Sequence, residues 1–134
     1  MSLRIDHFVL TVADIEATVV FYRDVLGMRV EAFEPSGGGG KRLEICFGDQ
    51  KINLHPSDDP YLPHAKYPQP GSADFCLISE LPLADWQERL EATGIAIEGG
   101  PVRRTGATGP ILSIYLRDPD GNLVEISNPI RGAG

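Results

Sequence analysis

The chain has 134 residues, of which 42% are hydrophobic and 23% are charged, and its formal net charge is −7. This length is that of a single domain, residues 1–134, that can bury a hydrophobic core, and the negative charge argues against nucleic acid and anionic membranes as partners. The chain lacks both an apolar run of about 18 residues and a signal-peptide core, so we expect a cytoplasmic protein that does not enter a membrane.

The first half of the chain has the pattern of a strand, a helix and three further strands. Residues 3–12 alternate in polarity, which indicates a strand with His7 and every second residue on one face. Asp14 is a favourable N-cap for a helix over residues 15–26, and Gly27 permits the left-handed turn that ends it. The three further strands are expected at residues 28–33, 41–47 and 50–55.

A proline-rich segment, residues 56–72, follows the last of these strands. It contains five prolines, and proline both removes a backbone donor and restricts the residue before it, so we expect a loop. Loops of this length inside a compact domain are either functional or simple linkers. Both interpretations stay open for this segment.

The second half repeats the same order. A strand at residues 73–79 precedes a helix at 83–93, which Gly94 ends. Residues 99–109, GGPVRRTGATG, are glycine-rich and basic and are expected to form a flexible segment. The remaining strands are expected at residues 95–98, 111–116 and 123–127, the last two forming a hairpin that turns at Asp120-Gly121.

The two halves therefore form an internal repeat. The repeats cover residues 3–55 and 73–129, and the offset of about 67 residues between them is too long for a solenoid. It fits two βαβββ units of an α+β protein, in which polar residues at equivalent positions of the two units meet. The two cysteines, Cys46 and Cys76, lie in predicted strands without metal-type spacing and are expected to be buried free thiols.

Two segments, IDHFVLTVADIEATVVFYRDVLGM and YLRDPDGNLVEISNP, resemble the vicinal oxygen chelate superfamily of glyoxalases, bleomycin resistance proteins and extradiol dioxygenases. The segments GSADFCLIS and GPVRRTGATGPILSIYLRDPDGNLVEISN are similar to a subgroup that includes glyoxalase domain-containing protein 5 and virulence-associated glyoxalase-like proteins. The resemblance covers about residues 3–129. It implies a curved, partly closed mixed sheet around a cavity, and it implies a homodimer.

The resemblance also implies one divalent metal ion, with ligands from the first and last strands of each unit. His7 and Asp74 occupy the two first-strand positions, and Asn53 and Glu125 the two last-strand positions. Glyoxalase I has histidine where Asp74 stands and an acid where Asn53 stands, but His55 lies two residues after Asn53 on the same strand face. We therefore expect His7, His55 and Glu125 as ligands, with Asp74 as a candidate fourth. This set suits zinc, nickel, iron, manganese or cobalt.

Each of these residues also has a purely structural explanation. A histidine in a strand can simply be hydrogen-bonded, and Glu125 can be a paired core carboxylate. Asn53 is expected to orient His55 or to contact the substrate. Arg103 and Arg104 are expected to bind an anionic substrate, since guanidinium groups bind carboxylates and phosphates. A solvated basic turn is the alternative for these two arginines.

The leading functional prediction is a glyoxalase I-like reaction, of the lactoylglutathione lyase type. The metal would stabilise an enediolate-type anion of a small oxygen-chelating substrate, either anionic or a thiol adduct, and Glu125 would move the proton. The alternatives are an extradiol dioxygenase, an epimerase or thiol transferase, and a module that sequesters a drug or antibiotic without catalysis. Asp74 in a histidine position argues against the dioxygenase.

Overall fold

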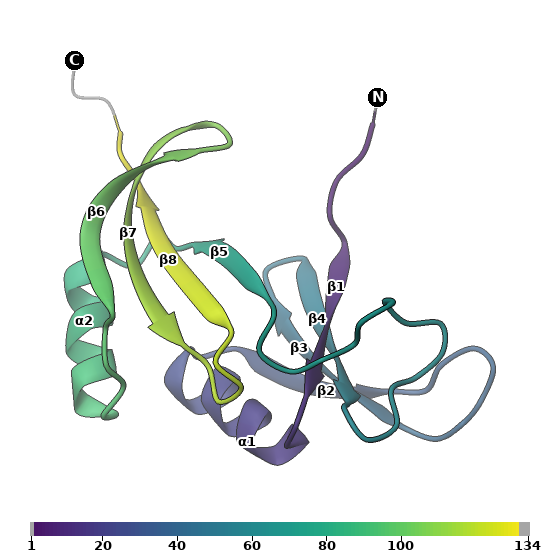
Figure 1. Ribbon diagram of the computed structural model, residues 1–134. Helices are drawn as coiled ribbons and strands as arrows, with labels where there is room; N and C mark the ends of the chain where they lie inside the picture. The colour runs from purple at the N-terminus through teal and green to yellow at the C-terminus, as the bar shows by residue number, and fades with distance from the viewer. Residues whose placement is uncertain (1, 132–134) are drawn as a thin grey trace. The chain divides into compact units, whose positions relative to one another are not determined.

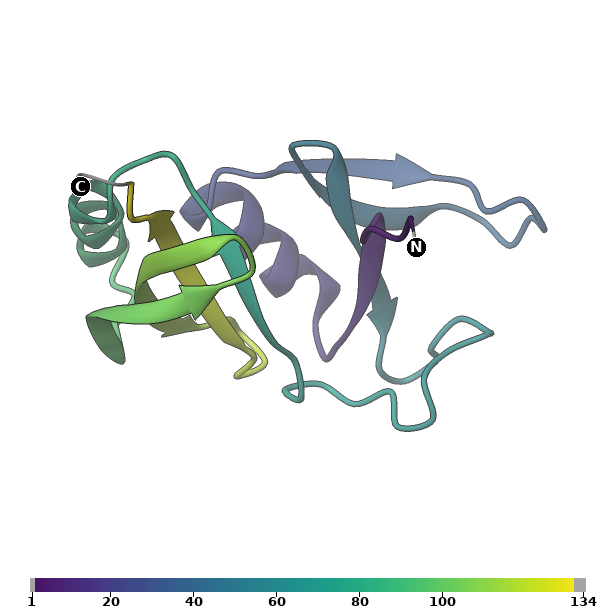
Figure 2. The ribbon, with the colours of Figure 1, turned by 90° about the horizontal axis from the view of Figure 1, so that it is seen from above.

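The computed structural model describes residues 2–131, which divide into two compact units, residues 2–72 and 73–131. Each unit contains a four-stranded mixed sheet and one main helical segment, and each sheet is curved and not closed on itself (Figures 1 and 2). The predicted α+β class with two βαβββ repeats is confirmed. No helix within the described residues is long and apolar enough to cross a membrane.

Unit 1 has the strand order β1-β4-β3-β2, in which β1 is parallel to β4 and the other neighbours are antiparallel. The helix α1 packs against β4. The elements of unit 1 are β1 (His7–Val12), α1 (Ile15–Val20), the π-helical turn η1 (Phe21–Val25), β2 (Arg29–Phe33), β3 (Arg42–Phe47) and β4 (Gln50–Pro56).

Unit 2 has the equivalent order β5-β8-β7-β6, with β5 parallel to β8. The helix α2 packs against β8. The elements of unit 2 are β5 (Asp74–Ile78), α2 (Leu83–Ala92), β6 (Gly99–Gly106), β7 (Gly109–Arg117) and β8 (Leu123–Pro129).

The first helix begins and ends where the sequence predicts. The Asp14 carboxylate accepts a hydrogen bond from the Ala17 amide at 3.1 Å, as an N-cap does. Gly27 has φ of 76°, and the Met28 amide donates to the Tyr22 carbonyl at 3.0 Å. This bond spans one residue more than the long bond of a Schellman ending, in keeping with the wider π-helical turn before it. The π-helical turn just before this ending was not expected from the sequence.

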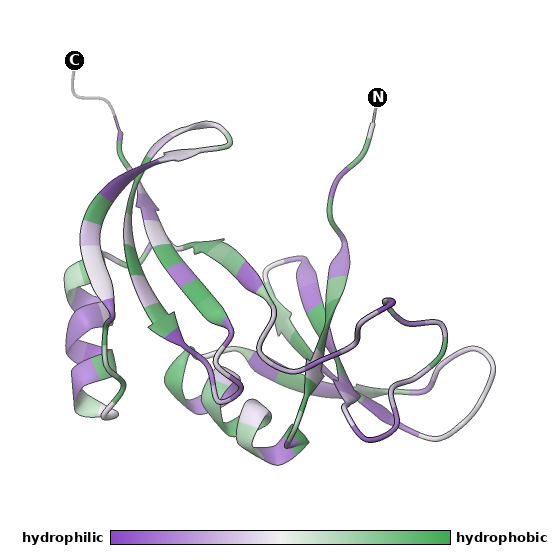
Figure 3. Ribbon diagram, viewed as in Figure 1, coloured by the Kyte–Doolittle hydropathy of each residue, from purple (hydrophilic) through white to green (hydrophobic). Residues whose placement is uncertain are grey.

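Alternation along the strands separates a packed face from a polar one in each sheet. In β1, Leu10 and Val12 are buried while His7 and Val9 are exposed. Hydrophobic and hydrophilic residues likewise alternate along β8 (Figure 3). The buried aliphatic residues of β4 and β8 lie on the side that contacts the helices, so the polar side chains of interest lie on the opposite face of each sheet.

The prediction for residues 95–109 is wrong. Residues 95–98 form no strand, and the segment expected to be flexible contains the edge strand β6. Its register shifts between Gly99 and Val102, and a Cβ on Gly100 would lie 2.2 Å from the Ser113 carbonyl oxygen. Glycine and proline lower strand propensity, but an irregular edge strand accommodates both, and here β7 approaches too closely for any side chain.

The prediction of buried thiols holds for one cysteine only. Cys46 is buried in β3, whereas Cys76 is exposed. Cys76 lies on β5, the edge strand at the other end of the unit 2 sheet, at an alternate position opposite to Phe75 and Leu77. Strand alternation therefore places its thiol on the polar face of the sheet.

Candidate functional site

The polar face of unit 1 is defined by the register of β1 and β4. His7 pairs with Lys51, Val9 with Asn53, and Thr11 with His55. His7 and Asn53 are thus diagonal neighbours, and the spacing and rise of parallel strands put their Cα atoms about 8 Å apart. His7 and His55 are four residues apart along the strands, which corresponds to about 13 Å. Within unit 1 the register brings His7 near Asn53 and not near His55.

The His7 imidazole is oriented by the preceding residue. Its Nδ1 lies 2.8 Å from Asp6 Oδ2, and because a carboxylate only accepts, Nδ1 carries the proton. This hydrogen bond lowers the pKa of Asp6 below its usual value. Nε2 of the neutral ring then holds the lone pair. Metal-bound histidines characteristically donate their other ring nitrogen to a carboxylate in this way.

Glu125 lies in the middle of the polar face of unit 2, between Cys76 on β5 and Tyr115 on β7. Its Oε2 accepts a hydrogen bond from Ser113 Oγ at 2.6 Å, and Ser127 Oγ lies 3.4 Å from the same oxygen. Both serines are fully buried. Because both serine hydroxyls lie next to Oε2, Oε1 is the carboxylate oxygen that can take a ligand or a proton.

The hydroxyl groups around Glu125 have a defined direction. Ser113 and Ser127 are 2.6 Å apart, and Ser127 is 3.2 Å from the Cys76 thiol. Each hydroxyl has a single proton. If Ser113 donates to Glu125, Ser127 must donate to Ser113, and Cys76 then donates to Ser127. Cys76 is exposed as a residue, but the partial desolvation of its thiol against the sheet is the largest influence and raises the pKa of Cys76, so the thiol keeps the proton that this arrangement needs.

Asp74 begins β5 and is exposed. It pairs with Leu123, which places it diagonally from Glu125. This is the same relation that His7 has to Asn53 in unit 1. The four positions derived from the repeat therefore occupy matching places in the register of the two sheets.

His55 is only 7% exposed, and its Nδ1 has no hydrogen-bond partner. Burial lowers the pKa of His55, and the charge of Arg42 lowers it further. Asn53 is half-buried, and its Oδ1 also lacks a partner. Two polar side chains of β4 thus have unsatisfied buried atoms, which is uncommon unless a ligand or water completes them.

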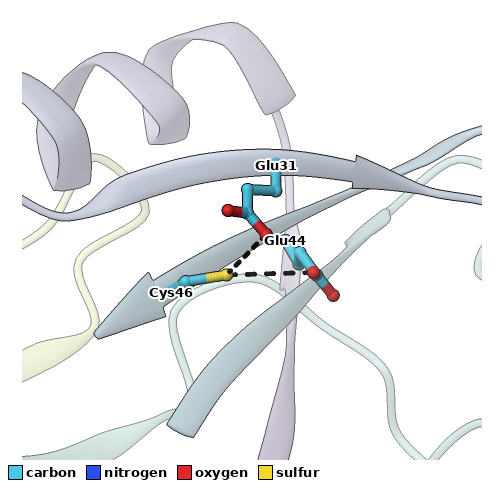
Figure 4. A group of neighbouring side chains, drawn as sticks. All are labelled: Glu31, Glu44 and Cys46. Carbon is cyan, nitrogen blue, oxygen red and sulfur yellow. Dashed lines mark hydrogen bonds between the residues drawn. The ribbon is translucent and has the colours of Figure 1, made fainter. Parts of the chain in front are cut away.

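One cluster was not found from the sequence. Glu31 on β2 and Glu44 and Cys46 on β3 place ligand-type atoms within 4.8 Å of one another (Figure 4). Lys51 forms an ion pair with Glu44, and burial raises the pKa of Cys46, which disfavours the thiolate that a metal requires. We interpret the cluster as an internal ion-pair network. Glu44 and Cys46 are two residues apart in a predicted strand, which was the available sequence signal.

Arg103 and Arg104 lie on β6 and line a shallow pocket of about 380 Å³ with Thr105, Gly109 and Pro110. Both side chains are exposed. Arg104 Nε donates to the Tyr115 hydroxyl at 2.8 Å, and Tyr115 pairs with Glu125 in the register. The two arginines thus lie on the edge strand β6 instead of a flexible turn.

The fold and the two polar faces define a glyoxalase-like protein. The chain belongs to the Glyoxalase/Bleomycin resistance protein/Dioxygenase superfamily, which it matches over residues 4–126. The resemblance drawn from the sequence is thereby confirmed.

Individual relatives agree with this assignment. Virulence protein STM3117 of Salmonella typhimurium is 52% identical over 124 residues, or 92% of this chain and 83% of the relative. The crystal structure of STM3117 matches the structure of this chain with a TM-score of 0.87, and the match covers 97% of this chain and 99% of the relative. Glyoxalase domain-containing protein RDO1 of Mycosarcoma maydis is 51% identical over 96% of this chain and 70% of its own. Lactoylglutathione lyase of Agrobacterium tumefaciens is more distant, with 27% identity, a TM-score of 0.67 and coverage of 93% and 92%.

Proposed function

We propose that this protein is a metal-dependent lyase or isomerase of the glyoxalase I type that acts on a small oxygen-chelating substrate. The observation that carries the proposal is the His7–Asp6 hydrogen bond, which presents the imidazole of a family ligand position with its Nε2 lone pair available. The superfamily match and the similarity to a lactoylglutathione lyase support the reaction class.

In this proposal His7 of unit 1 and Asp74 and Glu125 of unit 2 hold one divalent ion, whether one chain or two copies supply them. One imidazole and two carboxylates form a nitrogen and oxygen set that fits zinc, nickel, iron, manganese or cobalt. His55 is left out of this set because the register of β1 and β4 separates it from His7. When bound, the ion supplies positive charge that stabilises an anion of the substrate.

The other residues act on the substrate directly. Glu125 would accept the proton at Oε1 in place of its contact with the ion, while Ser113 holds Oε2 and so fixes the direction of the carboxylate. Asn53 accepts a hydrogen bond from a substrate hydroxyl at its unpartnered Oδ1. Arg103 and Arg104 attract an anionic group of the substrate from their exposed positions on β6.

Metal analysis provides the first test. Purified protein is expected to contain about one divalent ion per chain by elemental analysis, as three protein ligands imply. The metal-loaded protein is then expected to convert the methylglyoxal–glutathione adduct, measured by the absorbance of the thioester product. Metal without turnover would remove glyoxalase chemistry and leave the wider metalloenzyme proposal in place.

A second function, sequestration of a small molecule without catalysis, is favoured by the departures at Asn53 and Asp74. Asn53 is neutral where an acid is usual, and Asp74 supplies a carboxylate where histidine is usual. The change at Asn53 removes an acidic ligand, and the change at Asp74 replaces an imidazole with a carboxylate. Negligible metal content in protein purified without chelators would contradict the enzyme proposal and make this binding function the leading one.

We also propose that the protein is a homodimer, as the family resemblance implies. β1 and β2 at the ends of the unit 1 sheet, and β5 and β6 at the ends of the unit 2 sheet, each have one unpaired side in the described chain. Such edges favour pairing with another surface. Light scattering is expected to give twice the 14.6 kDa chain mass; the mass of a single chain would contradict the proposal.

A further inference from the structure

Unit 1 contains a pocket of about 420 Å³ that the proposed reaction does not use. Its walls come from the polar face of β1 and β4 and from the proline-rich segment that follows β4. The lining residues are Val9, Thr11, His55, Pro63, His64 and Ala65. A pocket of this size, with apolar walls and a few polar groups, is typical of sites for small organic molecules.

The segment is attached to the sheet through Tyr61. The Arg42 guanidinium lies 3.8 Å from the centre of the Tyr61 ring, and the His55 ring meets Tyr61 edge-on with centroids 5.0 Å apart. Cation–π and edge-to-face contacts of this kind are favourable. They hold Arg42 and His55 close to the same aromatic ring, next to the pocket.

Arg42 brings a positive charge that has no acidic partner among the described residues. Its buried Nε makes no hydrogen bond, and the neighbouring Glu44 is paired with Lys51 instead. His55 adds a second unsatisfied buried atom, Nδ1. In a protein with 19 acidic and 12 basic residues, an unpaired half-buried arginine beside a pocket requires an explanation.

His64 completes the polar side of the pocket. Its Nδ1 donates to the Ala65 carbonyl at 2.8 Å, which fixes the ring and leaves Nε2 for a ligand. Thr11, the register partner of His55, adds a hydroxyl. No carboxylate lines this pocket. The charge nearby is therefore positive, which disfavours a metal cation and favours an anion.

We propose that this pocket binds a small organic carboxylate. The carboxylate faces His55, His64 and Thr11, with Arg42 supplying positive charge, and the apolar body of the ligand contacts Val9, Pro63 and Ala65. Thr11 and His55 donate hydrogen bonds to the carboxylate oxygens, and His64 donates from Nε2 when its ring carries a proton on both nitrogens. The site lies wholly within unit 1 and does not depend on the proposed metal ligands.

Benzoate is a suitable probe, because it combines a carboxylate with a flat apolar ring, and benzamide is its neutral counterpart. Saturable benzoate binding is expected by calorimetry and by amide shifts in NMR spectra that are confined to residues around the pocket. Arg42→Gln and His64→Ala are each expected to weaken benzoate binding by about tenfold, as lost charge-assisted contacts do. Arg23→Gln removes the same charge from an exposed position on η1 and is expected to leave binding unchanged.

The proposal would be overturned if benzoate showed no saturable binding, if benzamide bound as well as benzoate, or if Arg42→Gln bound benzoate with wild-type affinity. A fourth contrary outcome is that the protein binds Ni²⁺ through His55 and His64 and does not bind benzoate. His64 lies outside the sheet, so the His64→Ala variant remains informative if Arg42→Gln folds poorly. Glu125→Ala is expected to keep full benzoate affinity. Failure of the metal proposal and failure of this one are therefore separable.

Discussion

Replacing Glu125 with alanine is expected to reduce the metal content from about one ion per chain to a trace and to abolish turnover of the methylglyoxal–glutathione adduct. The affinity for the ion is expected to fall by more than about 100-fold, because even residues that only orient a ligand contribute about 10–100-fold. Elemental analysis after dialysis measures the first effect, and the thioester absorbance measures the second.

Two milder variants distinguish a ligand from a structural carboxylate. Glu125→Gln keeps the size of the side chain and the Ser113 hydrogen bond but removes the charge, so it is expected to lose metal as well. Ser113→Ala keeps the charge and removes the 2.6 Å bond that orients it, so metal affinity is expected to fall by only about 10–100-fold. Circular dichroism serves as the control for folding. Full metal content in the folded Glu125→Ala protein would sink the proposal.

The sequence predicted most of the fold because alternation and end signals are local. β1 alternates in burial as residues 3–12 alternate in polarity, and Asp14 and Gly27 mark the helix ends through bonds to nearby residues. β6 was missed because its formation depends on a long-range contact. Only its approach to Ser113 on β7 explains why glycine stands at position 100.

The candidate site likewise combines residues that the sequence could indicate with contacts that it could not. The family resemblance, mapped onto the repeat, indicated Glu125 and His7, but neither the serines that hold Glu125 nor the partner of His7 was predicted. Asp6 lies on the opposite face from His7 in an ideal strand. β1 begins only at His7, so Asp6 is released from the alternation and can turn its carboxylate to the imidazole. Likewise, the pocket at His55 depends on the folding back of the proline-rich segment, which has no periodic signal.

Asn122→Ala is expected to destabilise the protein by about 3–5 kcal/mol, because the part-buried Ala73 amide and the buried Asp118 carboxylate each lose a hydrogen bond at about 1–3 kcal/mol and a small cavity forms. Asn122 is 1% exposed. Its Oδ1 accepts from the Ala73 amide at 2.9 Å, and its Nδ2 donates to Asp118 Oδ2 at 2.8 Å. These bonds join the turn between β7 and β8 to the start of β5, and so support the register that places Cys76 beside Glu125.

The matched control is Asn53→Ala, because the chain offers a second asparagine with the opposite character. Its Oδ1 is buried and unpartnered, so its removal is expected to cost less than about 1 kcal/mol or to stabilise the fold slightly. Urea unfolding followed by circular dichroism compares the two variants, and the single tryptophan, Trp86 on α2, reports on unit 2. Equal destabilisation by both substitutions would show that Asn53 is satisfied and structural. A neutral or stabilising Asn53→Ala that lowers turnover would instead indicate that the protein retains an unpaired amide for its substrate.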